Sequence, residues 1–171
     1  KIIKEIYARE DVSRFADITQ SDLLKLIDST SLQMLGTEYW VFKVNTDVEV
    51  FVCRDINQSE VPFWLELTGF NKTDGFIKNE NVHYEVWRKI FKKGQINLGV
   101  NGFDRHRYTY FVALKALDKN EKLEINPIWP INQQSYQLKV GSYIYTDWDE
   151  LTVTEFSNSL QNCRILPTSR G

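Results

Sequence analysis

The sequence is poor in cysteine, in histidine and in long apolar runs, and its charges nearly cancel. Its 171 residues include two cysteines and two histidines, and 21 basic residues stand against 23 acidic ones, for a net charge of −2. No apolar run approaches the roughly 20 residues that span a bilayer, and no basic stripe is present to attract a phosphate backbone. The sequence therefore predicts neither a membrane span nor a nucleic-acid partner. A chain of this length buries a normal core without disulfide staples, so we expect one domain, or one domain with a fragment of a second.

The residues that most often carry enzymatic chemistry are scarce. The histidines, His83 and His106, have no partner four residues away and no neighbouring cysteine, so their spacing does not predict a zinc site. No Gly-x-Ser-x-Gly motif is present, and Cys53 lies in an apolar, strand-like segment where a thiol makes a poor nucleophile. We therefore expect no catalytic residue, no metal site and no cofactor.

Carboxylates gather at two places in the sequence. Asp147, Asp149 and Glu150 cluster in "YTDWDEL", and Asp104 lies in "GFDRHRY". Such groups could hydrolyse a glycosidic bond or hold calcium, but both tasks need a fixed separation between the carboxylates. Acids in loops are usually only solvated, so the sequence favours a protein that is not an enzyme.

Signals of processing and location favour a secreted or extracellular protein. The sequence opens at Lys1 without an initiator methionine or a signal peptide, which suits either a cytosolic chain or one whose leader has been removed. The triplets that begin at Asn57 and Asn71 match the N-glycosylation sequon in polar, turn-like segments. Cys53 and Cys163 could form one disulfide, although Cys53 could equally be a small core residue.

The dominant hydrophobic period is two, which is typical of strands. In residues 39–53 it predicts a hairpin whose strands, 40–44 and 48–53, are joined by a short polar loop. The segment 106–117, "HRYTYFVALKAL", predicts a further strand. Tyr108, Tyr110, Val112 and Leu114 are expected to share one face of it.

The stretch "FKKGQINLGVNG" predicts a second hairpin. A strand at 83–91 ends there, Gly94 supplies the positive φ of a tight turn, and residues 96–98 resume the alternation on the return strand. No helix is expected after the glycines of this stretch, so they do not predict a phosphate-binding loop.

Residues 19–29 leave two alternatives open. Thr19 or Ser21 could cap a short helix, or 23–27 could be a buried strand. Residues 6–33 align without a gap over 144–171, which suggests a partial repeat, and the second copy alternates as strands. We therefore favour the strand.

The repeat suggests a division of the chain. Residues 1–118 would form one module and 119–138 a linker. Residues 139–171 would begin a second copy of the opening strands, or supply strands that complete the first sandwich.

Several short motifs follow one another in an order known from one kind of module. They are Phe42-Lys43-Val44-Asn45, the run 47–52, Phe63-Trp64-Leu65, Gly69-Phe70-Asn71-Lys72-Thr73, the stretch 84–94 with Leu98-Gly99 and Asn101, the run 110–115, and Val140-Gly141 with Tyr145-Thr146-Asp147. This order resembles the accessory β-sandwich modules of secreted bacterial polysaccharide lyases and glycoside hydrolases. The resemblance implies an all-β, antiparallel sandwich, immunoglobulin-like or jelly-roll-like, attached to carbohydrate-active proteins. It implies no catalytic residues, and Trp148, Lys93 and Val100 depart from the usual Arg, Ala and Gly.

The abundance of aromatic residues favours binding of a polysaccharide or another glycan. Five Trp, eight Tyr and ten Phe exceed what one small core absorbs, so we expect some rings at the surface, where they can stack on the apolar face of a pyranose. The candidates lie beside polar loops and are Trp148 with Asp147 and Asp149, Trp129 between two prolines, and Tyr108 with Arg105 and Arg107. Trp40, Trp64 and Trp87 are expected in the core.

Two alternatives to glycan binding remain. The same fold could act as a structural or adhesive module without a ligand. It could also bind a protein through its C-terminal strands, since an unpaired apolar edge favours association.

Overall fold

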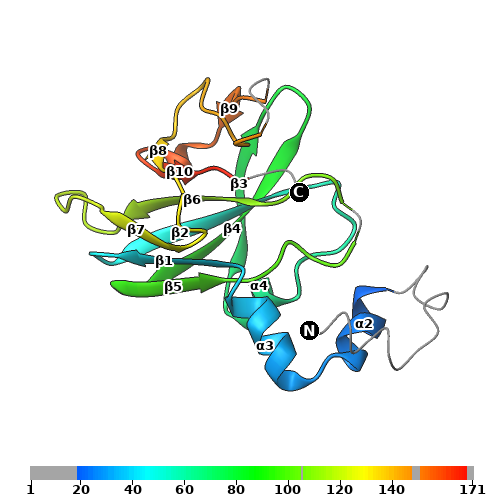
Figure 1. The fold of residues 1–171 in the computed structure, drawn as a ribbon. Helices are drawn as coiled ribbons and strands as arrows, with labels where there is room; N and C mark the ends of the chain where they lie inside the picture. The colour runs from blue at the N-terminus through cyan, green and yellow to red at the C-terminus, as the bar shows by residue number, and fades with distance from the viewer. Residues whose placement is uncertain (1–18, 105, 148–150, 169–171) are drawn as a thin grey trace.

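A computed structural model describes residues 19–104, 106–147 and 151–168 and contains two antiparallel sheets (Figure 1). One sheet has three strands in the order β5-β1-β7, and the other has seven in the order β8-β10-β6-β2-β4-β3-β9. The predicted all-β, sandwich-like fold is confirmed. The strands are β1 (Trp40–Val44), β2 (Val48–Asp55), β3 (Asn71–Lys78), β4 (His83–Phe91), β5 (Gly94–Leu98), β6 (Phe111–Ala116), β7 (Ile125–Trp129), β8 (Tyr136–Gln137), β9 (Glu155–Phe156) and β10 (Arg164–Leu166). The helices are α2 (Gln20–Leu26), α3 (Ser29–Thr37), α4 (Trp64–Leu67) and the 3₁₀ turn η2 (Asn158–Leu160).

The larger sheet is covered on both faces, because its central strands are apolar on both sides. In β2, Val50 and Val52 belong to one buried cluster, whereas Phe51 and Cys53 belong to a second. The first cluster lies against the smaller sheet, and the second is covered by residues of the C-terminal segment, among them Leu138, Ile144, Tyr145, Leu151, Val153 and Leu160. The C-terminal segment therefore forms a third layer on the same core.

The strands of both predicted hairpins form, but the predicted pairings are wrong. β1 pairs with β5 and β7, and β2 pairs with β4 and β6. Each predicted turn is thus an arch that carries the chain from one sheet to the other. The physical reason is that β2 and β4 are buried on both faces and must be central strands of the larger sheet. Gly94 has a φ of +133°, as its predicted turn role requires.

The two arches are tied together by one side chain. The Asp47 carboxylate in the first arch accepts hydrogen bonds from Lys92 Nζ at 2.8 Å and from the backbone N–H of Lys93 at 2.9 Å in the second. These bonds and the charge of Lys92 lower the pKa of Asp47. The lysines that interrupt the apolar run at 91–96 therefore join the two turns.

The favoured strand at 23–27 is wrong, because these residues lie in or just after a helix. The Thr19 hydroxyl accepts a hydrogen bond from the N–H of Asp22 at 3.2 Å and so caps α2, as its sequence position suggested. Asp28 caps α3 in the same way. A side chain that satisfies free helix N–H groups outweighs a short apolar run that either structure could contain.

The proposed repeat and linker also need correction. Residues 20–26 are helical, whereas their aligned counterparts 158–164 form η2 and the start of β10. The segment 119–138 contains β7 and β8, which pair with β1 and β10, so it belongs to both sheets and is no linker. The strands β9 and β10 extend the larger sheet.

The strand of the predicted segment 106–117 begins only at Phe111, and Tyr108 and Tyr110 contact different clusters.

Cys53 and Cys163 are free thiols, buried in the same cluster. Burial raises the pKa of Cys53 well above its ordinary value and that of Cys163 to about 12. We expect neither thiol to react with an alkylating reagent at pH 8 in the native protein, and both to react after unfolding in denaturant without reductant. Mass spectrometry counts the added groups. An unfolded, unreduced chain that takes up none would instead contain a disulfide.

Candidate functional site

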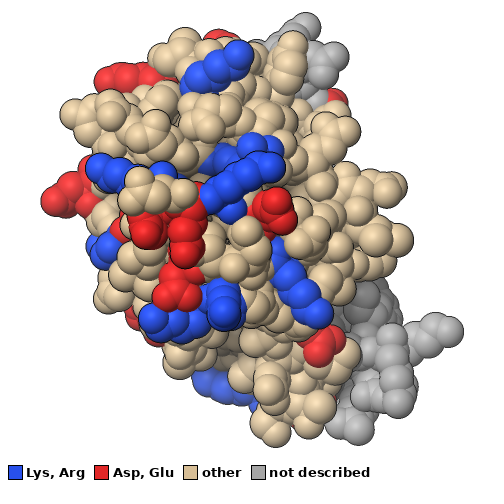
Figure 2. Space-filling model, turned by 90° about the vertical axis from the view of Figure 1, so that its left-hand side faces the viewer, with Lys and Arg blue, Asp and Glu red and all other residues tan. Residues whose placement is uncertain are grey.

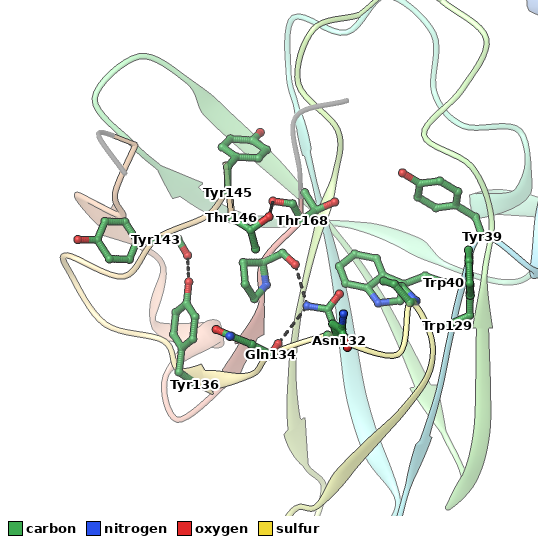
Figure 3. Close-up of a pocket in the computed structure, with 13 residues that line it drawn as sticks. Tyr39, Trp40, Trp129, Asn132, Gln134, Tyr136, Tyr143, Tyr145, Thr146 and Thr168 are labelled. Carbon is green, nitrogen blue, oxygen red and sulfur yellow. Dashed lines mark hydrogen bonds between the residues drawn. The ribbon is translucent and has the colours of Figure 1, made fainter. Parts of the chain in front are cut away.

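A pocket of about 650 Å³ lies where the segment 130–135 passes from β7 in the smaller sheet to β8 in the larger one (Figure 3). Its aromatic lining comprises Tyr39, Trp40, Trp129, Tyr136, Tyr143 and Tyr145. Its polar and remaining lining comprises Asn132, Gln133, Gln134, Thr146, Thr168, Pro130 and Pro167. We call this site the aromatic pocket.

The rings of the aromatic pocket stand on two opposite sides. Figure 3 shows Tyr39, Trp40 and Trp129 on one side, Tyr136 and Tyr143 on the other, and Asn132 and Gln134 between them. Trp129 is 58% exposed and Tyr143 is 48% exposed. Exposed rings that flank carboxamides can contact an apolar ligand face while amides bond to its polar groups.

Hydrogen bonds hold the pocket walls in place. Gln133 Nε2 donates to the backbone oxygen of Pro167 at 2.8 Å, which joins the 130–135 segment to the residue that follows β10. It also donates to the backbone oxygen of its neighbour Gln134 at 3.0 Å. The Tyr136 hydroxyl donates to the backbone oxygen of Tyr143. These bonds fix the segments that form the pocket walls before any ligand arrives.

Trp40 lines the pocket and has an unsatisfied donor. Its side chain is 2% exposed, and its Nε1–H has no hydrogen-bond partner among the described residues. The two other core tryptophans differ, since Trp64 Nε1 donates to the Val100 oxygen at 2.7 Å and Trp87 Nε1 donates to Glu85 Oε1 at 2.8 Å. A buried donor without an acceptor is costly. Because this nitrogen has less than 1 Å² of exposed surface, a ligand in the pocket cannot reach it without a movement of the wall.

The phenols of Tyr39, Tyr136 and Tyr145 stay protonated at neutral pH, because their pKa values are raised. Burial raises the pKa of Tyr39, and burial together with the proximity of Tyr143 raises the pKa of Tyr136 to about 12. Burial also raises the pKa of Tyr145. These side chains therefore add hydroxyl groups and no charge.

Of the predicted site residues that the structure describes, only Trp129 lines the aromatic pocket. Trp148, Asp149 and Arg105 lie outside the described residues. Asp147 is exposed and follows the lining residue Thr146. Tyr108 is half-buried against the second cluster, and its ring centroid lies 5.9 Å from that of Tyr145. The Arg107 guanidinium lies 5.8 Å from the centroid of the Tyr108 ring. Tyr108 is thus a packing residue in this structure rather than an exposed platform.

A second hollow, of about 540 Å³, has a different character. Its lining includes six ionisable side chains, Glu49, Lys115, Lys119, Glu121, Lys122 and Arg164. Figure 2 looks onto the side where the loop between β6 and β7 projects, and acidic and basic side chains are intermixed there. Lys115 is paired with Glu49 at 3.2 Å, and the Arg164 guanidinium bonds to Ser135. We call it the charged hollow; its four basic side chains outnumber its two acidic ones.

The candidate metal and acid groups have local partners. His106 Nε2 lies 2.9 Å from Asp55 Oδ2, and the Asp104 carboxylate accepts from Gln58 Nε2 at 3.0 Å and Ser59 Oγ at 3.2 Å. Within the described ranges no group of three His, Cys, Asp or Glu side chains could hold a metal ion.

None of the described helices is long and apolar enough to cross a bilayer.

Comparisons with protein-family models, with curated proteins and with solved structures gave no match to this chain. The resemblance to accessory modules therefore stays a prediction from the sequence motifs.

Proposed function

We propose that this chain binds a glycan in the aromatic pocket and does not catalyse a reaction on it. The observation that carries the proposal is the exposed ring of Trp129, which lines the pocket together with a set of carboxamides. A pyranose offers an apolar C–H face to stack on such a ring and hydroxyls to bond to amides. Hydrogen bonds from Gln133 and Tyr136 already hold the pocket walls, so little conformational entropy is lost when a ligand binds.

Binding of a protein partner through the C-terminal strands is less well supported than binding of a glycan. The outer strands of the larger sheet, β8 and β9, are two residues long, so they offer few unpaired backbone groups to a partner. β7 is an outer strand of the smaller sheet and contains Pro127, which cannot donate a backbone hydrogen bond.

We further propose that the protein acts outside the cytoplasm, as an accessory module of a carbohydrate-active protein. The motifs that resemble such modules support this, and both sequon asparagines, Asn57 and Asn71, have exposed side chains. Fractionation of the source cells, with an antibody to this chain, tests the location. Recovery of the protein only from the cytosol would contradict it.

Replacing Trp129 with alanine is expected to weaken glycan binding at least about tenfold, because the ring would supply the stacking surface and a tenfold loss is about 1.4 kcal/mol. A glycan array identifies binders, and titration calorimetry of the wild-type and Trp129→Ala proteins measures the loss. Ile128→Ala is the matched control, since Ile128 is also an exposed residue of β7 but does not line the pocket. Equal affinities for the wild type and Trp129→Ala would remove the pocket from the proposal.

A further inference from the structure

The aromatic pocket differs from the rest of the surface in charge. None of its described lining residues is Asp, Glu, Lys, Arg or His, in a protein in which 26% of residues are charged. The charged hollow, which is of similar size, has six ionisable side chains. The polar side-chain groups of its described lining are carboxamides, hydroxyls and the indole N–H groups of Trp40 and Trp129, all uncharged.

We infer that the aromatic pocket takes an uncharged glycan and discriminates against uronic acids and sulfated sugars. This inference rests on the proposed function and adds the class of ligand. It concerns a property that neither the motifs nor the fold specifies, namely the absence of a charged side chain among the described residues that line the pocket.

The physical reason is the cost of desolvating a charge. A carboxylate or sulfate that moves from water into a concave site loses several kilocalories per mole of hydration free energy unless it pairs with a cation there. The described lining offers no cation. A neutral hydroxyl loses less on desolvation and recovers it through one or two ordinary hydrogen bonds. The absence of a cation among the described lining residues therefore favours neutral sugars over charged ones.

The donors and acceptors suit hydroxyl groups. Asn132 and Gln134 are exposed, and each carboxamide presents both a donor and an acceptor, as a sugar hydroxyl does. Gln133 uses its amide nitrogen for the pocket wall. A sugar hydroxyl can accept a hydrogen bond from the amide N–H and donate one to the amide oxygen. An anionic group can only accept from the N–H, so the amide oxygen is left without a donor.

The test compares each glycan that binds with its charged counterpart. The counterparts are the same oligosaccharide oxidised at C6 to the uronate, or the same oligosaccharide carrying a sulfate ester. We expect the neutral form to bind at least about tenfold more tightly, and its Kd to stay constant between about 50 and about 500 mM NaCl, since no ion pair would be screened. Calorimetry of the full chain gives both quantities.

A single substitution extends the test to the protein. Asn132→Asp introduces a carboxylate into the pocket with almost no change of shape, and we expect it to weaken neutral-glycan binding about tenfold or more. Asn126→Asp makes the same change at an exposed site on β7 that does not line the pocket, and we expect it to bind as the wild type does.

The outcomes separate this inference from the proposed function. Trp129-dependent binding of uronate or sulfated glycans at equal or higher affinity, or a Kd that rises steeply with salt, would overturn the inference and leave glycan binding in place. Absence of binding to every neutral and charged glycan would overturn both.

Discussion

Replacing Gly99 with alanine is expected to lower the free energy of unfolding by about 3 kcal/mol. A Cβ at this position would lie 2.4 Å from Trp64 Cδ1 and 2.7 Å from the backbone oxygen of Gly36. Neither neighbour can move easily. The Trp64 indole is buried, donates to Val100, and packs 5.6 Å from the Tyr110 ring, whose hydroxyl donates to the Gly99 oxygen at 2.6 Å.

The matched control is Gly36→Ala, on the other side of the same contact. A Cβ there would meet Trp64 Cβ at 3.5 Å, an ordinary van der Waals distance, and Gly36 lies within α3. Alanine favours a helix over glycine by up to about 1 kcal/mol, so we expect this variant to be as stable as the wild type or slightly more stable. Urea denaturation with equal m-values measures both changes. Equal stabilities of the Gly99→Ala and Gly36→Ala proteins would contradict the steric argument.

The hydrophobic period was sufficient to predict the strands but not their partners. Val50 and Val52 do face away from Phe51 and Cys53, and Tyr84 and Val86 do face away from Trp87, as the alternation indicates. Because both sets are buried, the pattern also fits a central strand of a larger sheet. Alternation within one strand contains no information about which distant strand will pair with it, so two arches were interpreted as hairpins.

The helices and the C-terminal layer were harder to predict for a different reason. The Thr19 cap is a local signal and was visible, whereas the preference for a strand came from an alignment of residues 6–33 with 144–171. Where the structure describes both copies, residues 20–26 and 158–164 differ in secondary structure. The packing of Leu138 and Ile144 on the second face is a long-range contact. Such contacts depend on the whole chain and leave no periodic mark near either residue.

The candidate site was partly visible in the sequence. Trp129 between two prolines was found, and the burial of Trp40, Trp64 and Trp87 was predicted and is confirmed. The other pocket rings were missed because they come from separate elements. A local signal was available, since three consecutive carboxamides, residues 132–134, follow Trp129 almost directly. The distance in sequence between Tyr39 and Tyr143 left no such signal.

Replacing Arg54 with methionine is expected to lower the free energy of unfolding by about 3–5 kcal/mol at neutral pH, because it would remove the buried one of the two cations that pair with a buried carboxylate. Arg54 and Glu85 are both buried, and Arg54 Nη1 donates to Glu85 Oε1 at 2.6 Å. Arg54 Nη2 also donates to the Gln58 oxygen at 2.5 Å. Lys72 and Trp87 still contact Glu85 in the variant, but Lys72 is mostly exposed and its charge is screened.

The control for this substitution is Arg88→Met, which removes an exposed arginine that contacts Glu49. Surface pairs contribute little, so we expect a loss of less than about 1 kcal/mol. In the double variant Arg54→Met/Glu85→Gln both charges are gone, and part of the lost stability should return. A loss in Arg54→Met no larger than that in Arg88→Met would show that the buried pair does not stabilise the fold.

The stability difference between wild type and Arg54→Met should depend on pH in a defined direction. Burial alone would raise the pKa of Glu85, but hydrogen bonds from Lys72 and Trp87 and the charge of Arg54 hold it below its ordinary value. A carboxyl with a lowered folded-state pKa stabilises the protein above its unfolded pKa, about 4.3, and this contribution is lost as pH falls through the folded pKa. Without Arg54 the folded pKa is less depressed, so less is lost on acidification. Urea denaturation at pH 7 and at about pH 3 should therefore show the gap between the two proteins narrowing in acid, and a gap that widens would contradict the assigned role of Arg54.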